Sequence, residues 1–310
     1  MILIAAMIGF SCGNTNRENV VTHNNNSIAP NNNVIRKEIP IRDSILQWVK
    51  VPEDILVKNY FKFMDKLILK ADTFKNWHIN EYILVHANPW ILDSLRSFDY
   101  YEKMEEGIFV YDQRELIILH KNDSLAIPDS AFAWKISKKL ETSVIDVNLP
   151  EFKLRLFQNG DTIFTCPVRV GRDGEKFIFV VGHIINLRTP IGIGEIKWID
   201  RMHKVINLDT GKEYTGTNRD DKHFTKIPII PWIEPAINGI RYGVMIHPTT
   251  NPETLGKAYS HGCIGTNEKD AWTIYYNAPK GTKVIFRYDL KVLNEKGDTI
   301  VLNDIYHLFD

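Results

Sequence analysis

From Ser143 onward, short segments of alternating apolar and polar residues follow one another along the chain. The segments FKLRLFQ and TIFTCPVRVG flank Asn159-Gly160, a dipeptide that strongly favours a tight hairpin turn. Further strand-like segments are SVIDVNLP, KFIFVVGHII, IGIGEIKWI, GIRYGVMIH and TKVIFRYDL. One late helix is predicted in NEKDAWTIYYNAP, with Asn267 as its N-cap. We therefore predict a mostly β domain over residues 143–310.

Residues 41–142 have a different pattern, in which apolar residues recur at helical spacing. VPEDILVKNYFKFMDKLILKAD predicts one helix, and INEYILVHANPWILDSLRSF predicts two short helices separated at Asn88-Pro89. GIFVYDQRELIILHKNDSLAIPD predicts short strands around a turn at KNDS. We expect a mainly helical α+β region here, whose role the sequence does not indicate.

The chain begins with MILIAAMIGFSC, an apolar run of about ten residues that ends in a cysteine. The run is too short to cross a hydrocarbon core of ~30 Å, but it has the length of a secretory signal. The small residues before Cys12 resemble the lipidation site of bacterial lipoproteins; a buried first strand or helix is the alternative. Residues 12–40 are Asn-rich and poor in large apolar groups. We expect a signal peptide over residues 1–11, a lipidated Cys12, a tether over 12–40, and a periplasmic location on a bacterial membrane.

The charge and the cysteine content narrow the classes of function. A formal net charge of zero gives no electrostatic reason to expect a nucleic-acid partner. The three cysteines are too few for a disulfide scaffold, and no CxxC pair is present to bind zinc. The sequence indicates no cofactor and no metal, and it leaves the oligomeric state open.

The stretch YSHGCIGTN places Cys263 directly after Ser-His-Gly. Cysteine is reactive as the thiolate, and a thiol with a pKa near ~8.5 is only slightly ionised at neutral pH, so a nucleophile needs a base or a cation nearby. His261 would share a face with Cys263 in an extended strand, and His247 ends the strand-like segment upstream. Four interpretations are open: a nucleophile, a zinc ligand beside both histidines, a disulfide partner of Cys166, and a small buried hydrophobe.

The segment IHPTTNPETLGKAYSHGCIG resembles the signature of the L,D-transpeptidase catalytic domain of the YkuD type. That signature is a His, a loop, and then Ser/Thr-His-Gly-Cys, and the pieces RTPIGIG and PWI occur in the family's order. The resemblance covers residues 145 to 288 and implies an L,D-transpeptidase-like β-sandwich with one helix after the nucleophile. Two positions depart from the family: Gly265 stands where Arg or Asn is usual, and Pro248 where a small residue is usual.

The resemblance implies acyl transfer on peptidoglycan stem peptides, by cross-linking or by exchange of a D-amino acid. Cys263 would attack the carbonyl before a terminal D-residue, and His247 would act as the base. The remaining expected site residues are Gly262 for the oxyanion, Ser260 and His261 in the pocket, and Trp232, Tyr242, Thr266 and Asn267 as substrate contacts.

Two points stay open at this stage. A catalytically silent peptidoglycan-binding lipoprotein could use the same groove, and a depressed pKa of the Cys263 thiol would favour the enzyme over it. The acyl acceptor is a stem peptide, water, a free D-amino acid or a protein amine. The long polar stretch from Ile199 to Ile227 has the composition of a functional lid or of a disordered loop.

Overall fold

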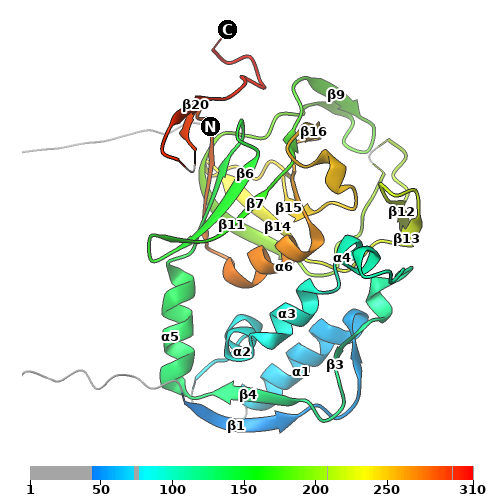
Figure 1. Ribbon diagram of the computed structural model, residues 1–310, viewed down its shortest axis with the longest axis vertical. Coiled ribbons are helices and arrows are strands. Elements are labelled where there is room, and N and C mark those ends of the chain that lie inside the picture. The colour runs from blue at the N-terminus through cyan, green and yellow to red at the C-terminus, as the bar shows by residue number, and fades with distance from the viewer. Residues whose placement is uncertain (1–43, 73–76, 208, 295, 310) are drawn as a thin grey trace, which may run out of the picture. The chain divides into compact units, whose positions relative to one another are not determined.

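The computed structural model describes residues 44–72, 77–207, 209–294 and 296–309. The predicted signal peptide, Cys12 and the tether lie outside these residues. Among the described residues, no helix combines the length and the apolar character needed to cross a bilayer. A helical part, drawn in blue to green in Figure 1, precedes a large sheet. The predicted fold class, a mostly β domain after a mainly helical α+β region, is confirmed.

The helical part contains five α-helices, two 3-10 turns and four short strands among its described residues. The helices are α1 (Tyr60–Asp72), α2 (Glu81–Ala87), α3 (Trp90–Arg96), α4 (Tyr100–Glu105) and α5 (Ser130–Glu141), with turns η1 (Val57–Asn59) and η2 (Gln113–Glu115). The strands are β1 (Ile45–Lys50), β2 (Ile55–Leu56), β3 (Ile117–Leu119) and β4 (Ser124–Pro128). The strands β3 and β4 do flank the KNDS turn, but they pair with β2 and β1 instead of with each other. The sequence did not predict helix α5.

The break between α2 and α3 shows why the sequence prediction succeeded there. Asn80 caps the start of α2, where its side chain accepts a hydrogen bond from the Ile83 N–H at 2.9 Å. Asn88 ends the helix, and its amide donates to the carbonyls of Leu84 and Ala126 at 2.8 and 2.9 Å. The same Asn88 side chain accepts from the Ala126 N–H, so the break is tied to strand β4.

The sheet of the second part has eight strands in the order β17-β15-β14-β11-β18-β5-β6-β7. They are β5 (Val144–Asn148), β6 (Lys153–Gln158), β7 (Asp161–Pro167), β11 (Gly192–Asp200), β14 (Trp232–Ile237), β15 (Ile246–Pro248), β17 (Ile264–Thr266) and β18 (Lys283–Arg287). Neighbours are antiparallel except for the parallel pairs β15–β17 and β18–β5. The predicted hairpin between β6 and β7 is confirmed, with Asn159 and Gly160 at φ of 53° and 87°, as its turn type requires.

Short paired strands and a 3-10 turn surround this sheet. They are β8 (Val170–Gly171) with β16 (Ala258–Ser260), β9 (Glu175–Ile178) with β10 (His183–Asn186), β12 (Gly216–Asn218) with β13 (Phe224–Lys226), β19 (Lys291–Leu293) with β20 (Thr299–Val301), and η3 (Pro252–Thr254). The polar stretch after Ile199 is thus folded in part, as the β12–β13 hairpin. The strand predicted in GIRYGVMIH is wrong over most of its length: Gly239 and Gly243, at φ of 80° and 71°, interrupt the extended backbone before β15.

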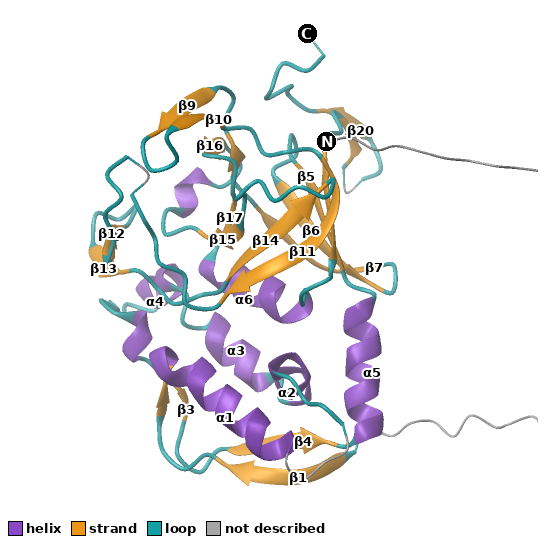
Figure 2. Ribbon diagram, turned by 180° about the vertical axis from the view of Figure 1, so that it is seen from behind, coloured by secondary structure: helices purple, strands orange, loops and turns teal. Residues whose placement is uncertain are grey.

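Helix α6 (Glu268–Asn277) lies between the sheet and the helical part, as both views show (Figures 1 and 2). It contacts α2, α3 and β15, and its rings of Trp272, Tyr275 and Tyr276 are buried. The Tyr276 hydroxyl lies 2.7 Å from that of Tyr60 in α1. The two parts therefore share one continuous hydrophobic core.

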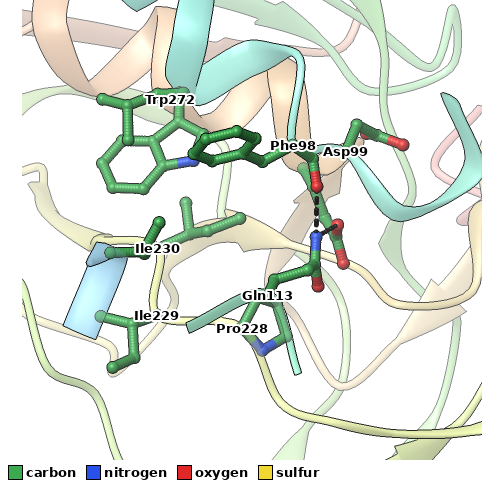
Figure 3. A pocket seen from close by; sticks show the side chains of 10 residues that line it. Phe98, Asp99, Gln113, Pro228, Ile229, Ile230 and Trp272 are labelled. Carbon is green, nitrogen blue, oxygen red and sulfur yellow. Dashed lines mark hydrogen bonds between the residues drawn. The ribbon is translucent and has the colours of Figure 1, made fainter. Parts of the chain in front are cut away.

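A buried polar cluster fastens this junction, and we call it the Arg219 network (Arg219, Glu268, Gln113 and Tyr100). The Glu268 carboxylate, at the start of α6, accepts hydrogen bonds from Arg219 Nη1 at 2.5 Å, Gln113 Nε2 at 2.6 Å and Tyr100 N at 3.0 Å. Figure 3 shows the cavity of about 10 Å³ beside it, where the Gln113 amide also reaches the Phe98 carbonyl. The network holds the helical part and the β12–β13 hairpin against α6.

Candidate active site

The parallel pair β15–β17 brings Cys263 and His247 together. His247 lies in β15 opposite Gly265, and Cys263 directly precedes β17. The Cys263 sulfur accepts a hydrogen bond from the Met245 N–H at 3.4 Å. Both side chains line the larger of two cavities on this side of the sheet. Two residues sixteen positions apart in the sequence thus meet because their strands are neighbours.

Ser260 and Gly262 shape the turn that presents the thiol. Ser260 Oγ accepts from the Gly262 N–H at 3.1 Å and donates to the Cys263 carbonyl at 2.7 Å. Gly262 has a φ of 111°, in the region that favours glycine, and its carbonyl accepts from Thr189 Oγ1 at 2.8 Å. The Gly262 N–H is therefore occupied within the turn. The Cys263 N–H has no acceptor among the described residues.

The orientation of the His247 ring fixes its tautomer. Nδ1 lies 2.8 Å from the carbonyl oxygen of Pro248, and because a carbonyl only accepts, Nδ1 carries the hydrogen. Nε2 is then left with a lone pair. Pro248 supplies this carbonyl although it departs from the family pattern.

The His247 ring is also held by a stack of aromatic rings. Its centroid lies 3.8 Å from that of Trp232 at an interplanar angle of 9°, and His203 stacks on the same Trp at 3.9 Å. His203 Nδ1 is in turn 3.1 Å from an Asp200 carboxylate oxygen. The sequence gives no signal for His203, because nothing in its spacing links it to the SHGC segment.

Burial sets the protonation of the pair at rest. Burial, together with the nearby Arg169 cation, lowers the pKa of His247 to about 3. Burial raises the pKa of the Cys263 thiol, against the opposing effects of the Met245 N–H and of Arg169. The depressed thiol pKa that would mark a resting thiolate is not found. At neutral pH the pair is a neutral imidazole beside a thiol, which suits proton transfer during attack.

Two cavities meet at His247. The larger measures about 1250 Å³ and the smaller about 540 Å³. The side chains that line both are Arg169, Val205, Trp232 and His247. The larger cavity is also lined by Ser260, His261 and Cys263, and by Tyr242, which is half exposed. His261 Nε2 is 3.3 Å from Arg172 Nη2.

The charges around the cavities are of one sign. Arg169, Arg172, Arg188 and Lys204 line the larger cavity, and Arg169 also lines the smaller one. No Asp or Glu is among the described residues that line either cavity. The site therefore favours a ligand that carries negative charge.

Two of the predicted substrate contacts lie elsewhere. Thr266 is fully buried and its hydroxyl donates to the Asn267 carbonyl, and neither residue lines either cavity. Asn267 has the backbone of an N-cap, but its side chain makes no capping hydrogen bond and instead donates to Asp270 Oδ2 at 3.3 Å. The reason is that β17 leads directly into α6, whose residues pack in the core.

The other interpretations of Cys263 find little geometric support. Cys166 and Cys263 are both free, and Cys166 is buried in β7, where burial raises its pKa. Within the described ranges, no three side chains of His, Cys, Asp or Glu are placed to hold a metal ion. Cys263, by contrast, lines a cavity beside an imidazole.

Comparison with known proteins agrees with this geometry. A protein of Bacillus licheniformis that carries the name L,D-transpeptidase YkuD is 32% identical over 92 residues, which are 27% of this chain and 53% of that protein. The chain thus spans about half the length of this curated relative.

Solved L,D-transpeptidases resemble the structure at low identity. The enzyme from Mycobacterium smegmatis is 16% identical, covers 47% of this chain and 58% of its own, and has a TM-score of 0.32. L,D-transpeptidase 3 of Mycobacterium tuberculosis was solved with a faropenem-derived adduct. It is 16% identical, covers 47% of this chain and 60% of its own, and has a TM-score of 0.31. The enzyme from Xylanimonas cellulosilytica is 12% identical, covers 79% of this chain and 100% of its own, and has a TM-score of 0.35.

The model of the L,D-transpeptidase catalytic domain (YkuD) itself matches residues 142–286. Through these residues, just under half of its length, the chain is similar to the L,D-transpeptidase catalytic domain family.

Proposed function

We propose that the chain is a cysteine-dependent acyltransferase that acts on peptidoglycan stem peptides. The observation that carries this proposal is the His247 tautomer: Nδ1 is committed to Pro248, and Nε2 is free to accept a proton beside Cys263. A module that only binds peptide has no need of a thiol and an oriented base in one cavity. The match of residues 142–286 to the model of the L,D-transpeptidase catalytic domain supports the reaction class.

The first half of the reaction uses the thiol and the imidazole in turn. Nε2 of His247 takes the proton of Cys263 as the sulfur attacks the carbonyl that precedes the terminal D-residue. The free Cys263 N–H is the donor we assign to the resulting oxyanion, a contribution of about 3 kcal/mol. The C–N bond then breaks, the imidazolium returns its proton to the leaving amine, and a thioester remains on Cys263.

The second half reverses the proton transfer. An acceptor amine, or water, attacks the thioester carbonyl and gives a proton to His247. The C–S bond breaks, the proton returns to sulfur, and the cross-linked or exchanged stem is released. We place this chemistry outside the cytoplasm, where peptidoglycan lies, with Cys12 as the proposed lipid anchor.

Product analysis with purified muropeptides tests the proposal. The full chain is incubated with stem tetrapeptides that end in a D-residue, and the products are separated by liquid chromatography with mass detection. We expect release of the terminal D-residue, together with dimers or hydrolysed stems, and an acyl mass on the Cys263 peptide. Absence of both release and adduct would overturn the proposal.

A β-lactam gives a second test, because its strained carbonyl offers the thiol the same acylation step. One similar enzyme was solved with a faropenem-derived adduct, which motivates the choice of a penem or a carbapenem. Intact-protein mass spectrometry should find one adduct, mapped to Cys263. Cys166, which is buried and free, is the internal control and should stay unmodified. A protein that processes muropeptides without forming this adduct would contradict the assigned nucleophile.

A further inference from the structure

The space beside Gly265 is filled by a side chain from another element. A Cβ atom at this position would lie 2.6 Å from Nε and 2.8 Å from Cγ of Arg169, closer than real Cβ contacts come. Two backbone hydrogen bonds join the two residues. The Arg169 N–H donates to the Gly265 carbonyl at 2.9 Å, and the Gly265 N–H donates to the Arg169 carbonyl at 3.0 Å. Only glycine leaves enough space at position 265, and the Arg169 side chain occupies that space.

This guanidinium belongs to a half-buried side chain and has few hydrogen-bond partners. Arg169 Nη1 donates to Thr254 Oγ1 at a long 3.3 Å, and the buried Nε has no hydrogen-bond partner. Within the part of the chain that the structure describes, no carboxylate forms an ion pair with Arg169. An unpaired buried cation is costly, whereas a planar guanidinium with free donors binds a carboxylate through two parallel hydrogen bonds.

The position of Arg169 places these donors where a substrate would pass. It is the only Arg or Lys among the described residues that lines both cavities, and His247 lines both with it. Its charge acts on the Cys263 thiol and on the His247 imidazole, so it lies within electrostatic range of the reacting groups. Arg172, Arg188 and Lys204 line the larger cavity only.

We propose that Arg169 is the carboxylate-binding residue of this site: its guanidinium, packed into the space left by Gly265, binds the free carboxylate of the acyl donor's terminal residue. Arg169 lies in the β7–β8 connection. It thereby provides a positive charge that Gly265, in the strand after Cys263, does not have. The identity of the carboxylate rests on the proposed function; the binding of a carboxylate beside Cys263 does not.

Alkylation of Cys263 tests the anion site without any peptidoglycan chemistry. Iodoacetate and iodoacetamide form the same bond to sulfur and differ in the carboxylate. The rate ratio of iodoacetate to iodoacetamide, read on the Cys263 peptide by mass spectrometry, should fall about tenfold or more in Arg169→Gln, the size of one lost charge-assisted contact. Lys204→Gln removes the same charge from the rim of the larger cavity and should leave the ratio within about twofold.

Iodoacetamide serves as its own control for folding, since a disrupted site would change its rate in Arg169→Gln. Arg169→Lys is the second variant: it keeps the charge, loses the planar fork, and should give an intermediate ratio. An unchanged ratio in Arg169→Gln, or an equal fall in Lys204→Gln, would overturn the inference in favour of a diffuse positive field.

Stem peptides with a free terminal carboxylate or a terminal carboxamide then link the site to the proposed function. The wild-type protein should prefer the carboxylate through a lower KM, and Arg169→Gln should lose that preference with little change in kcat for the amide. A preference that survives in Arg169→Gln overturns the inference while the transpeptidase proposal stands. Release from neither peptide, with the haloacetate ratio still dependent on Arg169, overturns the proposed function and leaves the anion site.

Discussion

Two arginines in this molecule have opposite surroundings. Arg219, at the junction of the helical part and the sheet, is 3% exposed and donates to Glu268, Gln113 and Thr225. Its guanidinium carbon also lies 4.3 Å from the centre of the Tyr100 ring. Arg169, at the wall between the two cavities, has one long hydrogen bond and a buried Nε without a partner. The fold satisfies one cation and leaves the other unsatisfied.

The difference separates what holds the protein together from what it offers to a ligand. A buried ion pair with its hydrogen bonds complete joins elements far apart in sequence, here residues of the helical part, the β12–β13 hairpin and α6. A cation held by one long hydrogen bond adds nothing comparable to folding, which favours a role in binding.

Removing the reacting groups should abolish activity and spare the fold. Cys263→Ala and His247→Ala should each lower release of the terminal D-residue by at least ~10³-fold, because nucleophile and base act as one unit. His247→Gln also removes the base but fills more of the space beside Trp232 than Ala does, so it separates loss of the base from loss of packing. Rates are measured by chromatography and folding by thermal denaturation, with His261→Ala as the matched control. Near-normal turnover in His247→Ala would make His261 the base.

The two arginines should differ sharply in their effect on stability. Arg219→Met leaves Glu268 buried without its cation and should lower the free energy of unfolding by about 3–5 kcal/mol. Arg169→Met replaces an unpaired cation by an apolar chain of similar length and should change it by less than about 1 kcal/mol. Urea denaturation with a shared slope measures both. An equal loss in the two variants would remove the contrast on which the comparison depends.

The pH dependence tests whether the site rests as a neutral pair. Because burial holds the pKa of His247 near 3, the base stays unprotonated in mild acid, and the acid limb of kcat/KM should lie below pH 6.5. Because the pKa of Cys263 is raised, its alkylation by iodoacetamide should keep rising with pH up to 9. A plateau in alkylation below pH 7 would instead indicate a preformed thiolate–imidazolium pair.

The sequence predicted those features that are determined locally. The Asn159-Gly160 hairpin and the helix break at Asn88-Pro89 follow from turn and capping residues, and the structure contains both. The predicted late helix α6 is also present, although its predicted cap, Asn267, makes no capping hydrogen bond. The residue pattern offered both His247 and His261 as a base for Cys263, and the family signature implied His247. Helix α5 and the partners of β3 and β4 depend on contacts distant in sequence, which single-sequence patterns do not carry.

The site residues that the sequence missed are also the ones that distant contacts create. Arg169 and His203 reach the site from the β7–β8 connection and from the end of β11, and neither has a motif. Gly265 stands where the family that the sequence resembles usually has Arg or Asn. The structure shows that a Cβ there would collide with Arg169. Gly265→Arg is therefore expected to disturb the site.

The smallest predicted effect compares one helix cap in each part of the molecule. Asn80 accepts a hydrogen bond from the Ile83 N–H at the start of α2, so Asn80→Ala should lower the free energy of unfolding by about 1 kcal/mol. Asn267 occupies the same position before α6 without a capping hydrogen bond, and Asn267→Ala should change it by less than about 0.5 kcal/mol. Because Asn267 lines neither cavity, kcat/KM for muropeptides should also stay within about twofold. Urea denaturation and initial rates on both variants measure these differences.

A loss of stability in Asn267→Ala as large as that in Asn80→Ala would show that the contact of Asn267 with Asp270 contributes as much as a cap. A loss of turnover at unchanged stability would restore Asn267 as a substrate contact.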